Sequence, residues 1–172
     1  MPALFQHLSI TALNDSHKFE KFDCGDAARN AWLQSRALAS RAQDDSRCYV
    51  AADPDGRVFG FYAIATGAIL RSALPGALRR NAPDPVSCIL LAQLGAGLSC
   101  QGQGVGRELV LHAMGQAVKI AEIVSCRLLV VHPAPPEQAA YYHKFGFISI
   151  DAAPGPVMAM SLGTIRATLA AL

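Results

Sequence analysis

The chain has 172 residues and a mass of 18.2 kDa, the length of one ordinary domain. Hydrophobic residues make up 52% of it and charged residues only 16%, which excludes intrinsic disorder and leaves less charge than usual to cover the surface. The formal net charge of +2 is too small to indicate nucleic-acid binding on its own. We expect one domain over residues 1–172, with some apolar surface that meets a partner.

Targeting and metal signals are not found in the sequence. No apolar run approaches the roughly 18 residues of a membrane span, and the first residues do not resemble a secretory signal. The five cysteines show no CxxC spacing, and the five histidines have no ligand-like spacing. We therefore expect a soluble cytoplasmic protein in a reducing compartment, without a metal site and without membrane contact.

The first third of the chain predicts a strand, a helix and a β-hairpin. A strand is expected at Phe5–Leu13, and residues 22–45 form a turn at Cys24-Gly25 and then one helix with an apolar face. Two strands follow, at residues 47–53 and 58–67. The turn residues Asp53-Pro54-Asp55-Gly56 separate them and favour a tight hairpin.

The remaining elements alternate between buried strands and helices. Residues 68–85 carry three arginines and end in a proline-rich loop, and the apolar run Val86–Leu98 reads as a central strand buried on both faces. A glycine-rich loop opens into a helix over residues 100–123. A strand at 126–132, a proline-started helix at 133–147 and a strand within 154–165 complete an α/β domain with a mixed sheet.

The glycine-rich loop is the first candidate site. Because glycine has no side chain, a ligand can approach the backbone of Gly102, Gly104 and Gly106 closely, and free amides at the following helix start favour an anion such as a pyrophosphate. A P-loop needs a lysine and a hydroxyl residue after the last glycine, but Arg107 and Glu108 follow. A dinucleotide fingerprint also fits poorly, since position 107 is not glycine. A purely structural turn remains the alternative.

Gln101, Gly104 and Gly106 fit the QxxGxG signature, and over residues 45–162 the chain resembles the GCN5-related N-acetyltransferases (the GNAT family). The resemblance implies the GNAT fold, a mixed central sheet flanked by helices, with acetyl-CoA as cofactor. The residues implied to hold the coenzyme are one strand end and the loop: Leu94, Gly95, Ala96, Gln101, Gly102, Gln103, Gly104, Val105, Gly106 and Arg107.

A narrower resemblance covers almost the whole chain. The strings FDCGDAARNAWL, LPGALRRNAPDPVSCILLAQL, SCQGQGVG and VVHPAPPEQAAYYHKFGF are similar to acetyltransferase toxins of bacterial toxin–antitoxin pairs, of the TacT-like and AtaT-like groups. Such toxins acetylate the amino group of aminoacyl-tRNA and stop translation. The resemblance implies a small antitoxin partner of the ribbon-helix-helix type, and a homodimer is also considered. Gly97–Cys100 departs from the pattern, because charged or aromatic residues often precede the loop in these toxins.

Acetyl transfer to an amine needs a proton donor for the departing thiolate and a polarised carbonyl. By resemblance, Tyr142 is the expected acid, and a phenol with a pKa of about 10 is protonated at neutral pH. Packing within a helix is its alternative role. Backbone amides near Leu94–Ala96 are the expected donors to the carbonyl, provided that a bulge or splay leaves them unpaired.

No general base is evident. Residues 86–107 contain no aspartate or glutamate, and His132 reads as a structural strand-end residue. Deprotonating a lysine at neutral pH costs about 4 to 5 kcal/mol, whereas an α-amino group costs about 1 kcal/mol. A site without a strong base therefore suits an aminoacyl-tRNA α-amine better than a protein lysine.

Arginines supply the expected contacts to tRNA. Between residues 56 and 107 five arginines stand against one acid, Asp84. Arg79 and Arg80 are the main candidates for phosphate contact, with Arg71 and Arg36 in support. The expected function is thus a tRNA-acetylating toxin. The alternatives are an acetyltransferase for a small amine or a protein N-terminus, and a non-catalytic acyl-CoA-binding module.

Overall fold

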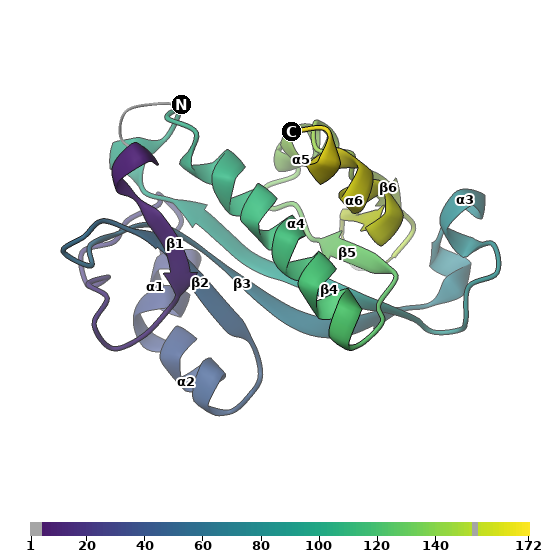
Figure 1. Ribbon diagram of the computed structural model, residues 1–172, viewed down its shortest axis with the longest axis horizontal. Coiled ribbons are helices and arrows are strands. Elements are labelled where there is room, and N and C mark those ends of the chain that lie inside the picture. The colour runs from purple at the N-terminus through teal and green to yellow at the C-terminus, as the bar shows by residue number, and fades with distance from the viewer. Residues whose placement is uncertain (1–4, 153–154) are drawn as a thin grey trace. The chain divides into compact units, whose positions relative to one another are not determined.

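The computed structural model describes residues 5–152 and 155–172 and shows a mixed sheet with flanking helices (Figure 1). Within these residues seven strands follow the order β1-β2-β3-β4-β5-β7-β6. The pair β4 and β5 is parallel, whereas β1–β2, β2–β3, β5–β7 and β6–β7 are antiparallel. The α/β class with a mixed sheet, predicted from the sequence, is confirmed.

The chain divides into two compact units. One unit contains the described residues up to Ala65 together with Ala92–Ala113, and the other contains Thr66–Leu91 and the residues from Met114 onward. Strands β3 and β4 and helix α4 contribute residues to both units. The two units are described separately below.

The first unit begins with a short 3-10 helix at Phe5–His7, so the strand expected at Phe5–Leu13 is shorter than predicted and β1 spans Ser9–Ala12. The helix expected within residues 22–45 is two helices, α1 (Ala27–Ser35) and α2 (Ala37–Ala42). Helical geometry is interrupted at Arg36, which has φ −121° and ψ −27°. Just before the break, the Ser35 hydroxyl donates to the carbonyl oxygen of Ala31 at 2.6 Å, a local bond that competes with regular helix geometry.

The predicted hairpin is confirmed, with β2 at Arg47–Ala52 and β3 at Val58–Ile69. The Asp53 carboxylate accepts hydrogen bonds from the backbone amides of Asp55 and Arg57, which closes the turn. Neighbouring residues of β3 face opposite sides of the sheet. Phe61 stacks on Trp32 of α1, with ring centroids 6.1 Å apart, while a Cβ at Gly60 would lie 2.9 Å from Leu109 of α4. Within this unit α1 and the start of α4 therefore cover opposite faces.

The second unit contains a short 3-10 helix at Arg71–Ala73, α3 at Gly76–Arg79 and β5 at Leu128–Val131. Two elements are shared with the first unit: strand β4 spans Val86–Ala96, and helix α4 spans Val105–Ile123. A 3-10 turn at Leu98–Cys100, in the first unit, lies between them. Both elements were predicted close to these limits. The burial of β4 is less complete than predicted, because Ser87 and Ala92 are exposed.

The C-terminal elements differ most from the prediction. The expected proline-started helix is shorter, with α5 at Gln138–His143, and a strand β6 at Ile148–Ile150 was missed. The expected last strand began at residue 154, outside the described residues, and β7 spans Val157–Ser161. A final helix α6, Leu162–Ala170, was also missed. Its N-cap is Ser161, whose hydroxyl oxygen accepts a hydrogen bond from the amide of Thr164.

Each unit has its own apolar core. In the first, Phe22 packs edge to face on Phe61, and Trp32 packs against the same core. All five cysteines are free thiols, and burial raises the pKa of Cys48 to about 12 and that of Cys88 to about 11. A thiol with so high a pKa is a poor nucleophile at neutral pH.

Among the described residues, no helix is long and apolar enough to cross a membrane, and no cluster of side chains is suited to hold a metal ion.

Candidate active site

The glycine-rich segment forms a bend between β4 and α4, as the sequence predicts. Gly102 and Gly104 have positive φ angles of 77° and 86°, a left-handed conformation that glycine adopts at little cost. A Cβ at Gly102 would meet no atom within 4 Å, so the space beside it is open. Gly106 lies in the first turn of the 19-residue helix α4, where amides lack an acceptor within the helix. The bend therefore offers backbone donors and the positive end of a helix dipole to an anion.

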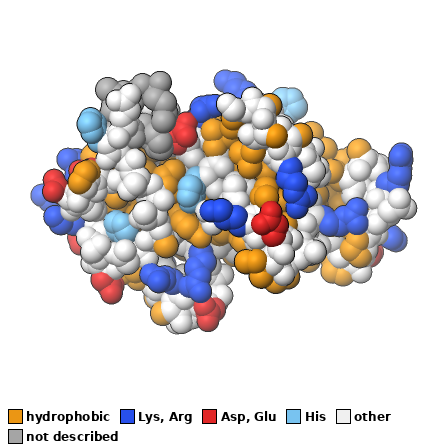
Figure 2. Space-filling model, viewed as in Figure 1, with side chains coloured by type: hydrophobic (Ala, Val, Ile, Leu, Met, Phe, Trp, Pro, Cys, Tyr) orange, Lys and Arg blue, Asp and Glu red, His pale blue; other side chains and the backbone are white. Residues whose placement is uncertain are grey.

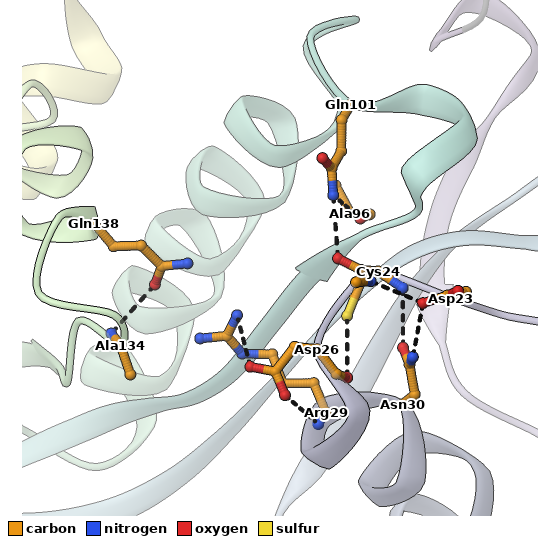
Figure 3. Close-up of polar contacts among 10 residues, drawn as sticks. Asp23, Cys24, Asp26, Arg29, Asn30, Ala96, Gln101, Ala134 and Gln138 are labelled. Atoms are coloured by element: carbon orange, nitrogen blue, oxygen red, sulfur yellow. Dashed lines mark hydrogen bonds and ion pairs between the residues drawn. The ribbon is translucent and has the colours of Figure 1, made fainter.

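Gln101 holds this bend in place (Figure 3). Its side-chain Nε2 donates to the carbonyl oxygen of Ala96, the last residue of β4, at 3.1 Å, and to that of Cys24 at 3.2 Å. The amide nitrogen is therefore used within the protein, and Gln101 shapes the glycine bend through bonds to the backbone. Gln103 makes one further bond inside the loop, from its Nε2 to the carbonyl oxygen of Ser99 at 3.3 Å.

The segment around Cys24, whose carbonyl oxygen accepts from Gln101, is itself held by a network of side-chain hydrogen bonds (Figure 3). Asn30 of α1 accepts from the backbone amide of Cys24 at 2.9 Å and donates to the Asp23 carboxylate at 2.9 Å. The same Asp23 oxygen accepts from the amide of Gly25 at 2.8 Å. These two donors, the Gly25 amide first, lower the pKa of Asp23. The Asp26 side chain caps α1 by accepting from the amide of Arg29.

The side chains of Val105 and Arg107 differ in how far a ligand could reach them. Val105 is 1% exposed, and a Cβ at Gly60 would lie 2.9 Å from its Cγ1, so only the backbone of Val105 is available to a ligand. The Arg107 guanidinium forms an ion pair with Glu108 at 2.8 Å, and both side chains lie at the start of α4. Of the two, Arg107 is the more exposed, at 53% against 22%, and its remaining donors can reach an anion at the helix start.

The end of β4 extends past its parallel neighbour. The pairing of β4 with β5 ends at Leu91 opposite Val131, the last residue of β5, whereas β4 itself continues to Ala96. Leu94–Ala96 therefore have no ladder partner in β5 among the described residues. Gly95 is buried, and a Cβ there would lie 3.1 Å from the Cys24 sulfur and 3.2 Å from the Phe61 ring. Close packing therefore favours glycine at the centre of the predicted donor stretch.

Tyr142 belongs to the other unit and lies on α5. Its side chain is 4% exposed and packs edge to face against Phe147, with ring centroids 5.7 Å apart. Tyr141 is less buried and makes an edge contact with Phe145 at 5.2 Å. The helix is preceded by a turn in which Gln138 accepts from the amide of Ala134 at 3.3 Å (Figure 3). The fold therefore fixes the Tyr142 ring firmly, as an acid of defined position requires.

The predicted tRNA-binding arginines differ in how far they are engaged inside the protein. Arg79 and Arg80, at the end of α3, are exposed, and Figure 2 shows basic side chains gathered over α3 at the right of the view. Arg71 is also exposed, but its guanidinium donates to the carbonyl oxygen of Ala82 at 3.2 Å. Arg127 donates in the same way to Asn81 at 3.0 Å. These two side chains hold the turn that follows α3.

The arginines of the first unit are divided in the same way. Arg36 is exposed at the break between α1 and α2. Arg41, by contrast, donates to the carbonyl oxygen of Leu13 at 2.7 Å, which ties α2 to the end of β1. Arg29 lies 3.6 Å from the Asp26 carboxylate. Arg36, which forms no ion pair with a described residue, is therefore available to an external partner.

Sequence reasoning missed a buried tyrosine–histidine pair. Tyr62 of β3 is fully buried, and its hydroxyl lies 2.7 Å from Nδ1 of His112 on α4. Burial raises the pKa of Tyr62 well above its ordinary value, so the phenol keeps its proton at neutral pH. Tyr49 stacks on the Tyr62 ring at 5.1 Å. Their spacing in the sequence gives no local signal, because the pair is formed only when α4 packs on β3.

Comparison with known proteins shows similarity to one family, to a curated relative and to solved structures. Residues 10–147 match the model of the acetyltransferase (GNAT) family. A tRNA-acetylating toxin of Mycobacterium tuberculosis (strain ATCC 25618 / H37Rv) is 39% identical over 135 residues, covering 78% of this chain and 81% of that protein. The solved structure of AtaT complexed with acetyl-methionyl-tRNAfMet has a TM-score of 0.87 at 25% identity, covering 93% of this chain and 98% of that chain. The structure of AtaTR bound with AcCoA has a TM-score of 0.82 at 25% identity. The match covers 94% of this chain and 98% of that chain.

Proposed function

Because the chain belongs to the acetyltransferase (GNAT) family, we propose that it is an acetyl-CoA-dependent N-acetyltransferase that acetylates the α-amino group of aminoacyl-tRNA and so acts as a toxin that blocks translation. The observation that carries the proposal is the glycine bend at the start of α4. The similarity to a tRNA-acetylating toxin supports the choice of substrate.

The residues of the bend fit the coenzyme. Acetyl-CoA, when bound, supplies an acetyl thioester and carries the negative pyrophosphate that a helix start favours. Gly102, Gly104, Val105 and Gly106 present backbone amides, and Arg107 adds a positive charge at the same end of α4. Gln101 and Gln103 keep the loop in its bent form through hydrogen bonds to backbone carbonyls. Leu94–Ala96 supply the amides beyond the end of β5.

Tyr142 is the proposed acid. Its hydroxyl holds the proton that a leaving sulfur requires, and its ring is fixed by Phe147. No carboxylate lies on the chain between Val86 and Arg107, so deprotonation of the attacking amine relies on the intrinsic acidity of that amine. An α-amino group needs about 1 kcal/mol for this at neutral pH, far less than a lysine.

Arg79 and Arg80 are the proposed tRNA contacts, with Arg36 in support. All three are exposed, and they make no hydrogen bond or ion pair to another described side chain. Arg71 acts mainly on the fold, because its guanidinium holds the carbonyl oxygen of Ala82. Phosphate contacts of this kind add affinity without reading the base sequence.

The finer partner assignments are proposals as well. A small ribbon-helix-helix antitoxin neutralises the protein, the chain works in the cytoplasm as a single domain, and two copies form a dimer. Apolar side chains left exposed, such as Leu70 at 65% and Ile123 at 84%, support the view that part of the surface is covered by a partner.

The direct test is incubation of the purified protein with labelled acetyl-CoA and total charged tRNA. We expect label on the aminoacyl end of the tRNA, released as N-acetyl amino acid when the ester is hydrolysed. Uncharged tRNA serves as the control and should remain unlabelled. Label on a free polyamine or on a protein N-terminus, with none on tRNA, would contradict the proposal.

A further inference from the structure

A small pocket lies in the first unit, at the side of the glycine bend that faces the β2–β3 turn. It has a volume of about 260 Å³, and its walls include Lys18, Lys21, Arg57, Phe22, Phe59 and Leu98. One wall is continuous with the coenzyme loop, because Gly97, Leu98 and Ser99 line the pocket and lead directly into the bend. The amide of Gly97 donates to the carbonyl oxygen of Phe59, and that of Leu98 to the carbonyl oxygen of Asp23. These two hydrogen bonds hold Gly97 and Leu98 against the other side of the pocket wall.

The pocket is lined by more basic than acidic side chains. Three basic side chains line it against one acidic residue, Asp23. One oxygen of the Asp23 carboxylate, Oδ1, accepts hydrogen bonds from the Gly25 amide and from Asn30. Among the described residues Lys18, Lys21 and Arg57 form no ion pair within 4.0 Å. Like charges gathered on one surface repel each other unless an anion neutralises them.

The apolar part of the wall suits a ligand with a flat or hydrophobic portion. The Arg57 guanidinium lies over the Phe59 ring, 5.1 Å from its centroid, a cation–π contact that holds the guanidinium at the pocket. Leu98 is 54% exposed at the rim. The volume is slightly below the roughly 300–1000 Å³ of small-molecule sites. A pocket of this size takes one unit of a longer chain more readily than a whole coenzyme.

Carboxylates lie in a second hollow beside the same cations. This hollow shares Lys18, Lys21 and Arg57 and is lined as well by Glu20, Asp53 and Asp55. These acids offset part of the positive charge and repel an anion from the second hollow. An anion is therefore better accommodated in the pocket next to the glycine bend, where Asp23 is the one acidic lining residue among those described.

We propose that Lys18, Lys21 and Arg57 bind one phosphodiester group of the RNA substrate, with the adjoining sugar or base against Phe59 and Leu98. This inference rests on the proposed function for the identity of the RNA. It adds a contact in the first unit to the arginines proposed above, and the contact lies beside the loop that holds the coenzyme. Lysine and arginine contacts to phosphates supply much of the affinity of a nucleic-acid complex and make it depend on salt.

The test compares three double variants with the wild-type chain. Lys18→Gln with Lys21→Gln removes two charges from the pocket, and Lys18→Arg with Lys21→Arg keeps them. Lys119→Gln with Arg166→Gln removes two charges from exposed positions elsewhere and is the matched control. Binding of uncharged and charged tRNA is measured by filter retention between about 50 and 200 mM KCl, and thermal unfolding checks that each variant is folded.

For the glutamine pair we expect tRNA affinity at low salt to fall about tenfold and the slope of log affinity against log salt to decrease by about one. The arginine pair and the control pair should bind like the wild type. The KM for acetyl-CoA and the rate with an amino acid ester that lacks RNA should not change. The binding assay needs no acetyl transfer, so it tests the pocket independently of the proposed function. If the wild-type protein binds tRNA through these lysines but does not acetylate it, the proposed function is refuted and the pocket proposal stands.

Other outcomes would overturn the pocket proposal. A raised KM for acetyl-CoA with unchanged tRNA binding would assign the pocket to a phosphate of the coenzyme. Competition by polyglutamate as effective as that by RNA of equal charge would assign it to an acidic protein. Equal loss of binding in the glutamine pair and the control pair would show only a general charge effect, and no loss in the glutamine pair would show that the lysines are not used.

Discussion

The side-chain nitrogen of Gln101 lies 3.2 Å from the carbonyl oxygen of Cys24, a residue 77 positions earlier in the chain. The same nitrogen reaches Ala96 at the end of β4. One side chain therefore joins the coenzyme loop, the strand before it and the segment that leads into α1. The position of the loop depends on all three.

Replacing Gln101 should weaken the coenzyme site without direct loss of a ligand contact. The variant Gln101→Ala removes both hydrogen bonds, which together contribute about 1–2 kcal/mol. We expect acetyl-CoA to bind about 5- to 30-fold more weakly, as measured by calorimetry. Gln43→Ala, at the end of α2, is the control and should bind normally. An unchanged affinity in Gln101→Ala would show that the loop keeps its form without this link.

Two glycines should respond to alanine in opposite directions. Gly102 has φ +77°, so Gly102→Ala forces a left-handed conformation that costs about 1–2 kcal/mol. Gly115 lies within α4, and a Cβ there would meet no atom within 4 Å, so Gly115→Ala should stabilise the protein by up to about 1 kcal/mol. Urea unfolding measures both changes. Equal effects in the two variants would contradict the backbone conformation assigned to the loop.

Tyr142→Phe tests the proposed acid. Phenylalanine keeps the ring that packs against Phe147, so thermal unfolding should change little. Loss of the proton donor should lower kcat by about 10²- to 10⁴-fold and abolish growth arrest when the protein is expressed. Tyr141→Phe is the matched control and should remain active and toxic. Full activity in Tyr142→Phe would remove Tyr142 from the mechanism.

Arg79→Gln combined with Arg80→Gln tests the arginine pair on α3. Both side chains are exposed, so the fold should survive, while loss of up to two phosphate contacts should reduce the salt slope of tRNA binding by up to about two. Acetylation of an amino acid ester without RNA should continue at the wild-type rate. A salt slope equal to that of the wild type would place tRNA on another surface.

Acid should weaken the Asp23 network. The Gly25 amide and Asn30 lower the pKa of Asp23 below its ordinary value of 3.8, so the ionised carboxylate stabilises the folded state above that pH. This stabilisation is lost as the pH falls through the lowered pKa. The gap in Tm between wild type and Asp23→Asn should therefore be constant from about pH 7 to about pH 5 and close in stronger acid. Asn30→Ala should show part of the same dependence, whereas a gap that widens in acid would reverse the assignment.

Local patterns were sufficient for much of the fold. The hairpin, the long strand β4, the glycine bend and the helix α4 follow from turn residues, apolar runs and glycine spacing, and all lie close to their predicted limits. The helices α1 and α2 were read as one because the apolar pattern continues through Arg36, although the backbone breaks there. The short strand β6 was missed because three residues carry too little periodicity to be recognised.

The sequence by itself determined the family and the glycine bend, because these depend on spacing along a continuous stretch. Only the tertiary structure decided how each side chain is used. Gln101 and Arg71 were expected to meet ligands, yet each donates to a backbone carbonyl of the protein, and those acceptors reach them only on folding. Lys18 and Lys21 come from one segment and Arg57 from another, and the pocket that they line forms when the chain before α1 meets the end of the β2–β3 turn.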